Sequence, residues 1–378
     1  MQHEIIHPHD LLLPNGELAE SGWARSPLLE YNREQIGHPA KRIKEWHYFF
    51  CGDETCGIGF FIADVGLLHT FSLSFMDFQK KFHLDKGSLC LPKDSLLQLP
   101  RDAYGSLKYG APGVSCELLG GRERILFKAR WERYDGKHPL DLNLTLHLPP
   151  GDTLCHYFPF VEEAGQFFYA HKRADIPLEG ELTLGEIRHT FDPRRAFAVQ
   201  DWGRGVWPGE THAYWGGGNG SVGGRPFSFN IGWDYQKSDT SEATENALFY
   251  DGRIHKLEEV TFCVNEKQKL WLEPWTFTSS DGRFEMRMDP IMDRFTKGPQ
   301  GPSHQVFGWY SGTVILDDGQ KLPLERIFGF AEKNVYRWGL VENLVVPLVT
   351  AGDFFRRIFK GPRRRGHSQV KINHGPHG

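Results

Sequence analysis

The sequence predicts an all-β protein built as two packed antiparallel barrels with a few short helices. The prediction depends on an aromatic-rich composition, on segments in which apolar and polar residues alternate, and on hairpin-turn pairs between such segments. Aromatic residues make up 13% of the 378 residues, and 42 glycines accompany them. Aromatic side chains favour strands and glycine favours tight turns, so this composition favours a β fold.

Two segments show the alternation most clearly. Between Leu142 and Leu148 every second residue is leucine, with polar residues in between. From 227 to 234, large apolar side chains occupy the odd positions and small or polar residues the even ones. A period of two predicts strands whose alternate side chains form a buried face.

Turn pairs punctuate the chain between such segments. They are Asp135-Gly136, Asn219-Gly220, Asp251-Gly252, Asp281-Gly282 and Asp318-Gly319. Each is typical of a two-residue hairpin loop. Consecutive hairpins predict an antiparallel meander, and closure into a barrel would remove its exposed edges. Helical signal is limited to short stretches at 28–35 and 75–82.

We expect four regions along the chain. A lead-in covers 1–40, a first barrel 41–176, a second barrel 177–340, and a basic, disordered tail 341–378. A chain of 378 residues is long enough for two cores. The tail contains FFRRIFK and Arg363–Arg365, so weak contact with an anionic membrane surface is the alternative to a tail without a role.

Composition and motifs exclude several classes of function. A formal net charge of −4 argues against a nucleic-acid partner, which would need a basic face. The first ten residues lack the features of a signal peptide and the 6 cysteines are scattered, so we expect free thiols and a cytoplasmic location. No dinucleotide, phosphate-loop or zinc-ligand pattern is found, so we expect no cofactor and no metal.

The richest group of functional side chains lies between 197 and 234. Asp201 is the candidate catalytic acid, because a carboxyl group in an aromatic-lined interior has a raised pKa and can hold a proton near neutrality. The candidate ligand-binding residues around it are Trp202, Arg204, Trp207, Tyr214, Trp215, Asn230 and Trp233. Their aromatic faces suit a developing cation. Arg204 has a second interpretation: it pairs with Asp201 and keeps a purely structural carboxylate ionised.

Several segments together resemble the family labelled domain of unknown function 2804. They are LLLPNGELAESGWARSPLLEYNRE, RIKEWHYF, QDWGRGVWP, TENALFYDGRIHKL and RIFGFAEKNVYRW, which extend from about Leu11 to Trp338. The central segment is more distantly similar to the carotenoid 1,2-hydratase group. That resemblance implies lipocalin-like (calycin) barrels and isoprenoid or polyene substrates.

The core pattern of the hydratase group reads aromatic-x-Asp-His-Glu-Trp. Asp201 and Trp202 fall on its acidic–Trp pair, whereas Val199 and Gln200 replace the Asp and His. The resemblance therefore implies the fold more than the reaction.

The preferred hypothesis is a protein that binds a hydrophobic, isoprenoid- or polyene-like small molecule, with acid-assisted hydration, isomerisation or cyclisation by Asp201. The first alternative is a non-catalytic carrier of a lipid-like ligand, whose cavity would be lined by apolar groups alone. The second is a carbohydrate-active protein with two carboxyl groups about 5 to 9.5 Å apart. The sequence leaves open whether the chain is an enzyme.

Overall fold

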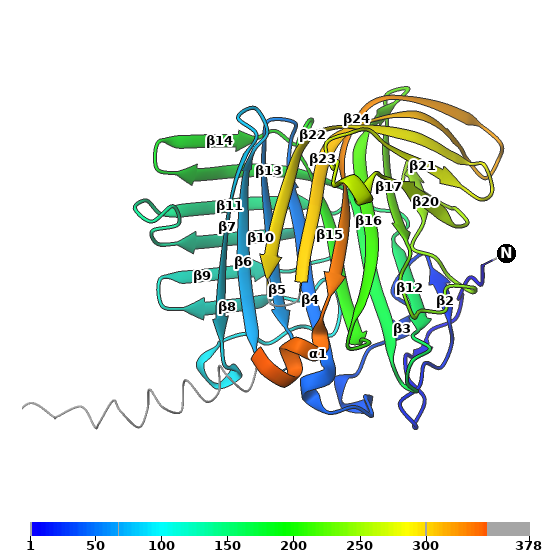
Figure 1. The fold of residues 1–378 in the computed structure, drawn as a ribbon, viewed down its shortest axis with the longest axis horizontal. Coiled ribbons are helices and arrows are strands. Elements are labelled where there is room, and N and C mark those ends of the chain that lie inside the picture. Colours follow the sequence, from blue (N-terminus) through cyan, green and yellow to red (C-terminus); the bar gives the residue numbers. More distant parts are fainter. Residues whose placement is uncertain (1, 67, 299–300, 346–378) are drawn as a thin grey trace, which may run out of the picture.

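Antiparallel strands form two large curled sheets in this protein. The computed structural model describes residues 2–66, 68–298 and 301–345. Within these residues, the helices are only short turns between strands or after the last strand. In Figure 1, yellow and orange strands cross in front of vertical blue strands, and a set of horizontal strands lies behind both. The expected all-β class with two barrel-like units and a few short helices is confirmed.

The first sheet has thirteen strands in the described part of the chain. They are β2 (Gly22–Ala24), β4 (Ile43–Gly52), β5 (Cys56–Asp64), β6 (His69–Asp77), β7 (Phe82–Cys90), β8 (Leu107–Ala111), β9 (Val114–Leu119), β10 (Arg124–Trp131), β11 (Leu140–His147), β12 (Leu154–Pro159), β13 (Phe167–Leu184), β14 (Ile187–Phe191) and β15 (Phe197–Val206). The main path runs β7-β6-β5-β4-β15-β13-β11-β10-β9-β8. A separate parallel pair joins β1 (His9–Asp10) to β3 (Leu29–Glu30).

Strand β13 bends the first sheet onto itself. Its register with β15 shifts between Arg173 and Ile176, and a bulge of this kind increases the local twist. Residues before the shift pair with β12, and residues after it pair with β11 and β14. Strands β8–β11 and β14 therefore cross behind β4–β7 (Figure 1). Apolar side chains fill the space between, with the rings of Phe60 and Phe127 stacked 3.8 Å apart.

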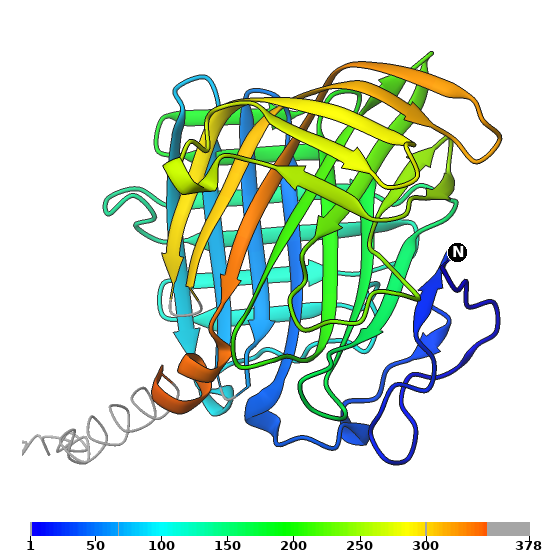
Figure 2. The same ribbon diagram turned by 45° about the vertical axis from the view of Figure 1, so that its right-hand side comes forward.

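The second sheet has nine strands in the described residues. They are β16 (Thr211–Val222), β17 (Arg225–Trp233), β18 (Ala247–Tyr250), β19 (Arg253–Lys256), β20 (Val260–Cys263), β21 (Trp275–Ser279), β22 (Phe284–Gly298), β23 (Gly301–Ile315) and β24 (Lys321–Tyr336), in the order β19-β18-β17-β16-β24-β23-β22-β21-β20. Register shifts after Pro290 and Tyr310 let the long strands curl over a second apolar core. Figure 2 shows these yellow and orange strands bending over at the top of the molecule.

The two sheets pack face to face. Strand β4 of the first sheet meets β23 and β24 of the second, where the ring of Phe50 lies 5.1 Å from Phe307 and 6.0 Å from Phe330. All ten residues of β15 are buried, because one face of this strand packs against the first core and the N-terminal lead-in and the other faces the second sheet.

Four of the five expected turn pairs join neighbouring strands, and one prediction was wrong. Asn219-Gly220 lies inside β16, and the hairpin turns instead at Gly223-Gly224. Both of these glycines have a positive φ (58° and 77°), which the turn requires and which a Cβ would disfavour.

The short helices differ from the expected ones. Three-residue 3-10 turns occur at Arg33–Gln35, Ala40–Arg42, Pro92–Asp94 and Glu266–Gln268. After β24 come α1 (Trp338–Leu340) and a π-turn (Val341–Val345). The first expected helix, 28–35, contains strand β3 followed by one of these 3-10 turns. No helix forms at 75–82, because β6 continues to Asp77 and β7 begins at Phe82.

The sheets divide the chain at a different point from the expected barrel boundary. Position 176/177 lies within β13, and the chain passes from the first sheet to the second between β15 and β16. Within the expected tail, Glu342 is buried and forms an ion pair with Lys44 at 2.9 Å. The remaining tail, 346–378, lies outside the described residues. No helix in the described ranges is long and apolar enough to cross a membrane.

Candidate functional site

A chamber of about 190 Å³ lies between the two sheets. Its walls are aromatic and polar at once: Trp46, Trp207, Trp215 and Tyr336 line it together with the carboxyl groups of Asp201 and Glu332. Asp201 comes from the first sheet and Glu332 from the second.

Strand pairing sets the row of side chains on the first-sheet wall. Asp201 on β15 is directly paired with Tyr48 on β4 and with Lys172 on β13. Directly paired residues project from the same face of a sheet, so the three side chains form one row. Trp46 Nε1 donates a hydrogen bond to Asp201 Oδ2 at 3.1 Å. Gly203 makes room for this indole, because a Cβ there would lie 2.2 Å from the Trp46 ring.

A buried ion network anchors Asp201. Lys172 Nζ lies 3.6 Å from Asp201 Oδ1 and 2.5 Å from Glu245 Oε2, and it sits 4.3 Å from the centre of the Trp215 ring. Asn230 accepts a hydrogen bond from Trp215 Nε1 at 2.8 Å and donates one to the carbonyl oxygen of Glu245 at 2.7 Å. Asp201 Oδ1 is buried and has no hydrogen-bond partner within normal distance among the described residues, so the Lys172 ammonium is its nearest charged neighbour.

The second-sheet wall has a matching row. Glu332 on β24 is paired with Trp215 on β16 and with Gln305 on β23. Asn334 Nδ2 donates to Glu332 Oε1 at 2.7 Å. Gln305 Nε2 donates to the Tyr48 hydroxyl of the opposite wall at 2.9 Å.

Burial and nearby charges shift the pKa values of this site. Burial raises the pKa of Asp201 above its ordinary value, although Lys172 opposes the shift. Burial raises the pKa of Glu332 to about 7, with the Asn334 hydrogen bond as the main opposing cause. Burial alone would lower the pKa of Lys172, but Asp201 and Glu245 outweigh it and raise the pKa, so this ammonium stays charged.

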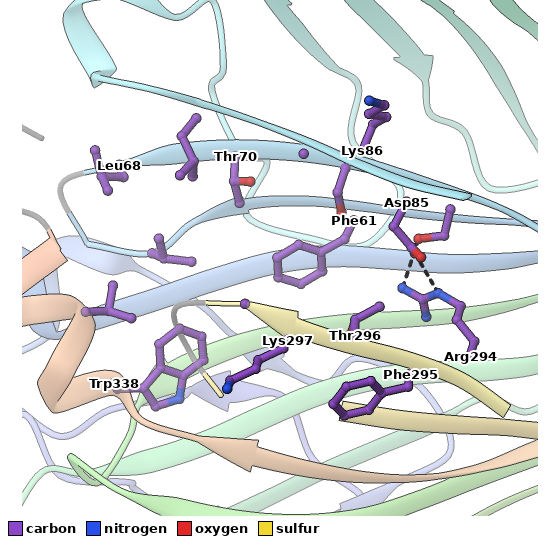
Figure 3. Close-up of a pocket in the computed structure, with 17 residues that line it drawn as sticks. Phe61, Leu68, Thr70, Asp85, Lys86, Arg294, Phe295, Thr296, Lys297 and Trp338 are labelled. Atoms are coloured by element: carbon purple, nitrogen blue, oxygen red, sulfur yellow. Dashed lines mark hydrogen bonds and ion pairs between the residues drawn. The ribbon is translucent and has the colours of Figure 1, made fainter. Parts of the chain in front are cut away.

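A larger groove of about 490 Å³ adjoins the chamber, and the two share lining residues that include Phe61, Arg294 and Trp338. Figure 3 shows Phe61, Phe295 and Trp338 around this groove and Arg294 reaching to Asp85. Arg294 also donates to Gln305 Oε1 at 2.7 Å, so its guanidinium is fixed between groove and chamber.

A family model matches residues 2–338 of the chain, under the description domain of unknown function, DUF2804. The chain belongs to the DUF2804 family. The resemblance seen in the sequence is thereby confirmed. No protein with a curated description matches the chain.

The DUF2804 chain is similar to several solved structures at low sequence identity. Kievitone hydratase from Nectria haematococca matches with a TM-score of 0.53 and 12% identity, over 87% of this chain and 99% of the hydratase. A Nitrosomonas europaea protein assigned as AttH matches with a TM-score of 0.44 and 12% identity, over 82% of this chain and 97% of that one. CghA matches with a TM-score of 0.39 and 10% identity, over 87% and 97%. At such identities only the first match bears on the argument, and it shows the fold alone.

The DUF2804 structure brings together some of the residues singled out in the sequence. Asp201, Trp207 and Trp215 line the chamber, and Asn230 lies behind Trp215, to which it is hydrogen-bonded.

Trp202 and Arg204 project from the opposite face of β15. Arg204 stacks on Trp202 at 3.9 Å and pairs with Glu45 at 3.5 Å, so the interpretation of an Arg204–Asp201 pair was wrong. Tyr214 belongs to the core of the second sheet, and the partly buried Trp233 packs against that core.

The sequence reasoning missed Trp46, Lys172 and Glu332 as site residues, and it gave Glu245 little weight. Trp46 and Glu332 stand in two of the segments that carry the family resemblance, RIKEWHYF and RIFGFAEKNVYRW. For Glu332 the available signal was its place directly after the apolar run IFGFA, because buried carboxyl groups need a partner or a function. Among the described residues, no group of three His, Cys, Asp or Glu side chains is placed to hold a metal ion.

Proposed function

We propose that this protein binds an unsaturated, largely apolar small molecule between its two sheets and transfers a proton to a carbon–carbon double bond of it. The observation that carries the proposal is the pair of buried carboxyl groups, Asp201 and Glu332, in a chamber walled by indole rings.

The two cavities suit a molecule with a reactive end and an apolar tail. Small-molecule sites commonly enclose about 300–1,000 Å³. The chamber of about 190 Å³ is below this range, whereas the adjoining groove of about 490 Å³ supplies the remaining space. The tail would lie against Phe61 and Phe295, and an oxygen atom of the ligand would meet Arg294 where the cavities join (Figure 3).

The surroundings of the carboxyl groups favour cation chemistry. Protonation of a double bond leaves a carbocation on the neighbouring carbon, and the faces of Trp46 and Trp207 stabilise such a charge. Addition of water then completes a hydration, and loss of a neighbouring proton completes an isomerisation.

The site favours an enzyme over a carrier. A carrier needs only apolar walls, and burying two carboxyl groups beside a cavity is costly for a protein that only stores a ligand. A carbohydrate-active site would share the indole rings and the two carboxyl groups, so a sugar probe is included in the test. The name of the structural neighbour kievitone hydratase suggests kievitone as one compound to test.

The proposal can be tested with farnesol, kievitone and maltose as probes. We expect farnesol or kievitone to quench tryptophan fluorescence and to gain the mass of one water on incubation, while maltose does neither. The double variant Asp201→Asn/Glu332→Gln should bind but not convert. Asp141→Asn, which alters an exposed carboxyl group, is the control. Quenching without conversion would favour the carrier, and binding of maltose alone would overturn the proposal.

A further inference from the structure

The two carboxyl groups of the chamber face each other across matching rows. The first row reads Tyr48–Asp201–Lys172, and the second reads Gln305–Glu332–Trp215. The rows touch at both ends: Gln305 is hydrogen-bonded to Tyr48 at 2.9 Å, and Lys172 sits over the Trp215 ring at 4.3 Å. With both ends in contact, the central residues of the rows, Asp201 and Glu332, lie opposite each other.

The partners of the two groups differ in charge. Asp201 has the ammonium of Lys172 at 3.6 Å and the Trp46 N–H at 3.1 Å, and both favour a carboxylate. Glu332 receives the neutral amide of Asn334 at 2.7 Å, and none of the described ion pairs includes it. The negative charge of Asp201 is one of the causes that raise the pKa of Glu332.

We propose that Glu332 is the proton donor of this site and that Asp201 is the carboxylate that removes a proton from water, which makes the reaction a hydration. This inference rests on the proposed function. Burial raises the pKa of Glu332 to about 7 and also raises the pKa of Asp201, so the charged partners of Asp201 distinguish the two groups. The sequence alone suggested Asp201 as the proton donor, and this inference gives that role to Glu332 instead.

The steps balance without any other reactant. The Glu332 carboxyl proton forms a C–H bond with the π electrons of the double bond, and a cation remains on the more substituted carbon. A water oxygen forms the C–O bond while one of its protons passes to Asp201. The product is an alcohol, and transfer of the proton from Asp201 back to Glu332 through water restores the starting state.

Deuterium exchange separates the two roles. In D2O, wild-type protein should convert farnesol to a deuterated alcohol and should also return some deuterated farnesol, because protonation is reversible. Glu332→Gln should lose both products by about 100-fold or more. Asp201→Asn should lose the alcohol to a similar extent but keep returning deuterated farnesol, because Glu332 still gives and retakes a proton. Glu332→Asp, which keeps a shorter carboxyl group, should retain part of the exchange.

The outcomes of the exchange experiment separate the assignment of the two roles from the proposed function. Exchange retained in Glu332→Gln and lost in Asp201→Asn would overturn the assignment and leave the proposed function standing. Wild-type protein that gives neither product from farnesol or kievitone would overturn the proposed function and this inference with it.

Infrared spectroscopy tests the proton on Glu332 without any substrate. At pH 6 the wild-type minus Glu332→Gln difference spectrum should contain the C=O band of a protonated carboxyl group. The same difference with Asp201→Asn should contain carboxylate bands instead. The reverse pattern would contradict the inference, and a cooperative melting transition in each of the three proteins would show that the variants are folded.

Discussion

Replacing Lys172 by methionine would remove the only ammonium of a buried three-residue network. The ammonium lies 2.5 Å from Glu245 and 3.6 Å from Asp201, and the side chains of Lys172 and Glu245 are 2% and 1% exposed. Methionine fills a similar volume, so the main effect is two carboxylates left without their counter-ion. Removing one partner of a buried ion pair costs about 3–5 kcal/mol.

The melting temperature measures this loss of stability. With about 2 cal/mol/K of unfolding entropy per residue, a loss of about 4 kcal/mol lowers the midpoint of a chain of this length by about 5 °C. Lys108→Met is the matched control, because Lys108 pairs with Glu117 at 2.6 Å on the surface with its side chain 63% exposed. Such a pair contributes about 1 kcal/mol or less.

Acid should reduce part of the effect. Because the pKa of Asp201 is raised above its ordinary value of 3.8, this carboxylate becomes protonated at a higher pH than an ordinary aspartate, and its share of the penalty shrinks as the pH falls. The difference between Lys172→Met and wild type should therefore be smaller at pH 4 than at pH 7. Equal midpoints of Lys172→Met and Lys108→Met at pH 7 would refute the idea that the network is held by charge.

Three more changes test other parts of the site. Gly203→Ala should lower stability by about 1–3 kcal/mol in denaturant titrations, because its Cβ would lie 2.2 Å from the facing indole, whereas Gly209→Ala, with its nearest atom at 3.8 Å, should change little. Trp215→Phe should weaken farnesol binding by about tenfold in fluorescence titrations, and Trp233→Phe, inside the second sheet, should leave it unchanged. The free energy of unfolding of Glu332→Gln, relative to that of wild type, should increase by about 3 kcal/mol as the pH rises from 4.5 to 7. The reason is that a carboxyl group with a raised folded pKa lowers the stability of the wild-type protein as the pH rises through this range. A difference that does not vary with pH would contradict the last expectation.

The regular strands could be predicted because their side chains obey a period of two. Strand β11 shows the expected buried leucines, and β17 buries Phe227, Phe229 and Ile231. In β17 the polar face is buried as well, because Ser228 and Asn230 point toward the first sheet. The packing of one sheet on another is not visible in the alternation of a single strand.

The candidate site was predicted only in part. The alternation of side chains along a strand, which is visible in the sequence, explains some of the wrong assignments. Neighbouring residues of a strand point to opposite faces, so Trp202 and Arg204 could not share the face of Asp201. Lys172 and Glu332 are far from Asp201 in the sequence. Strand pairing brings Lys172 to Asp201, and the packing of the sheets brings Glu332, and both depend on the whole chain.

The position of β24 has a consequence for synthesis of the protein on the ribosome. This strand is the last in the sequence, yet it lies in the middle of its sheet, between β16 and β23. Until Tyr336 has left the exit tunnel, β16 and β23 each present an unpaired edge, and unpaired edges invite association between nascent chains. A ribosome that stops before residue 321 would release a chain with both edges open, and chaperones would have to protect it.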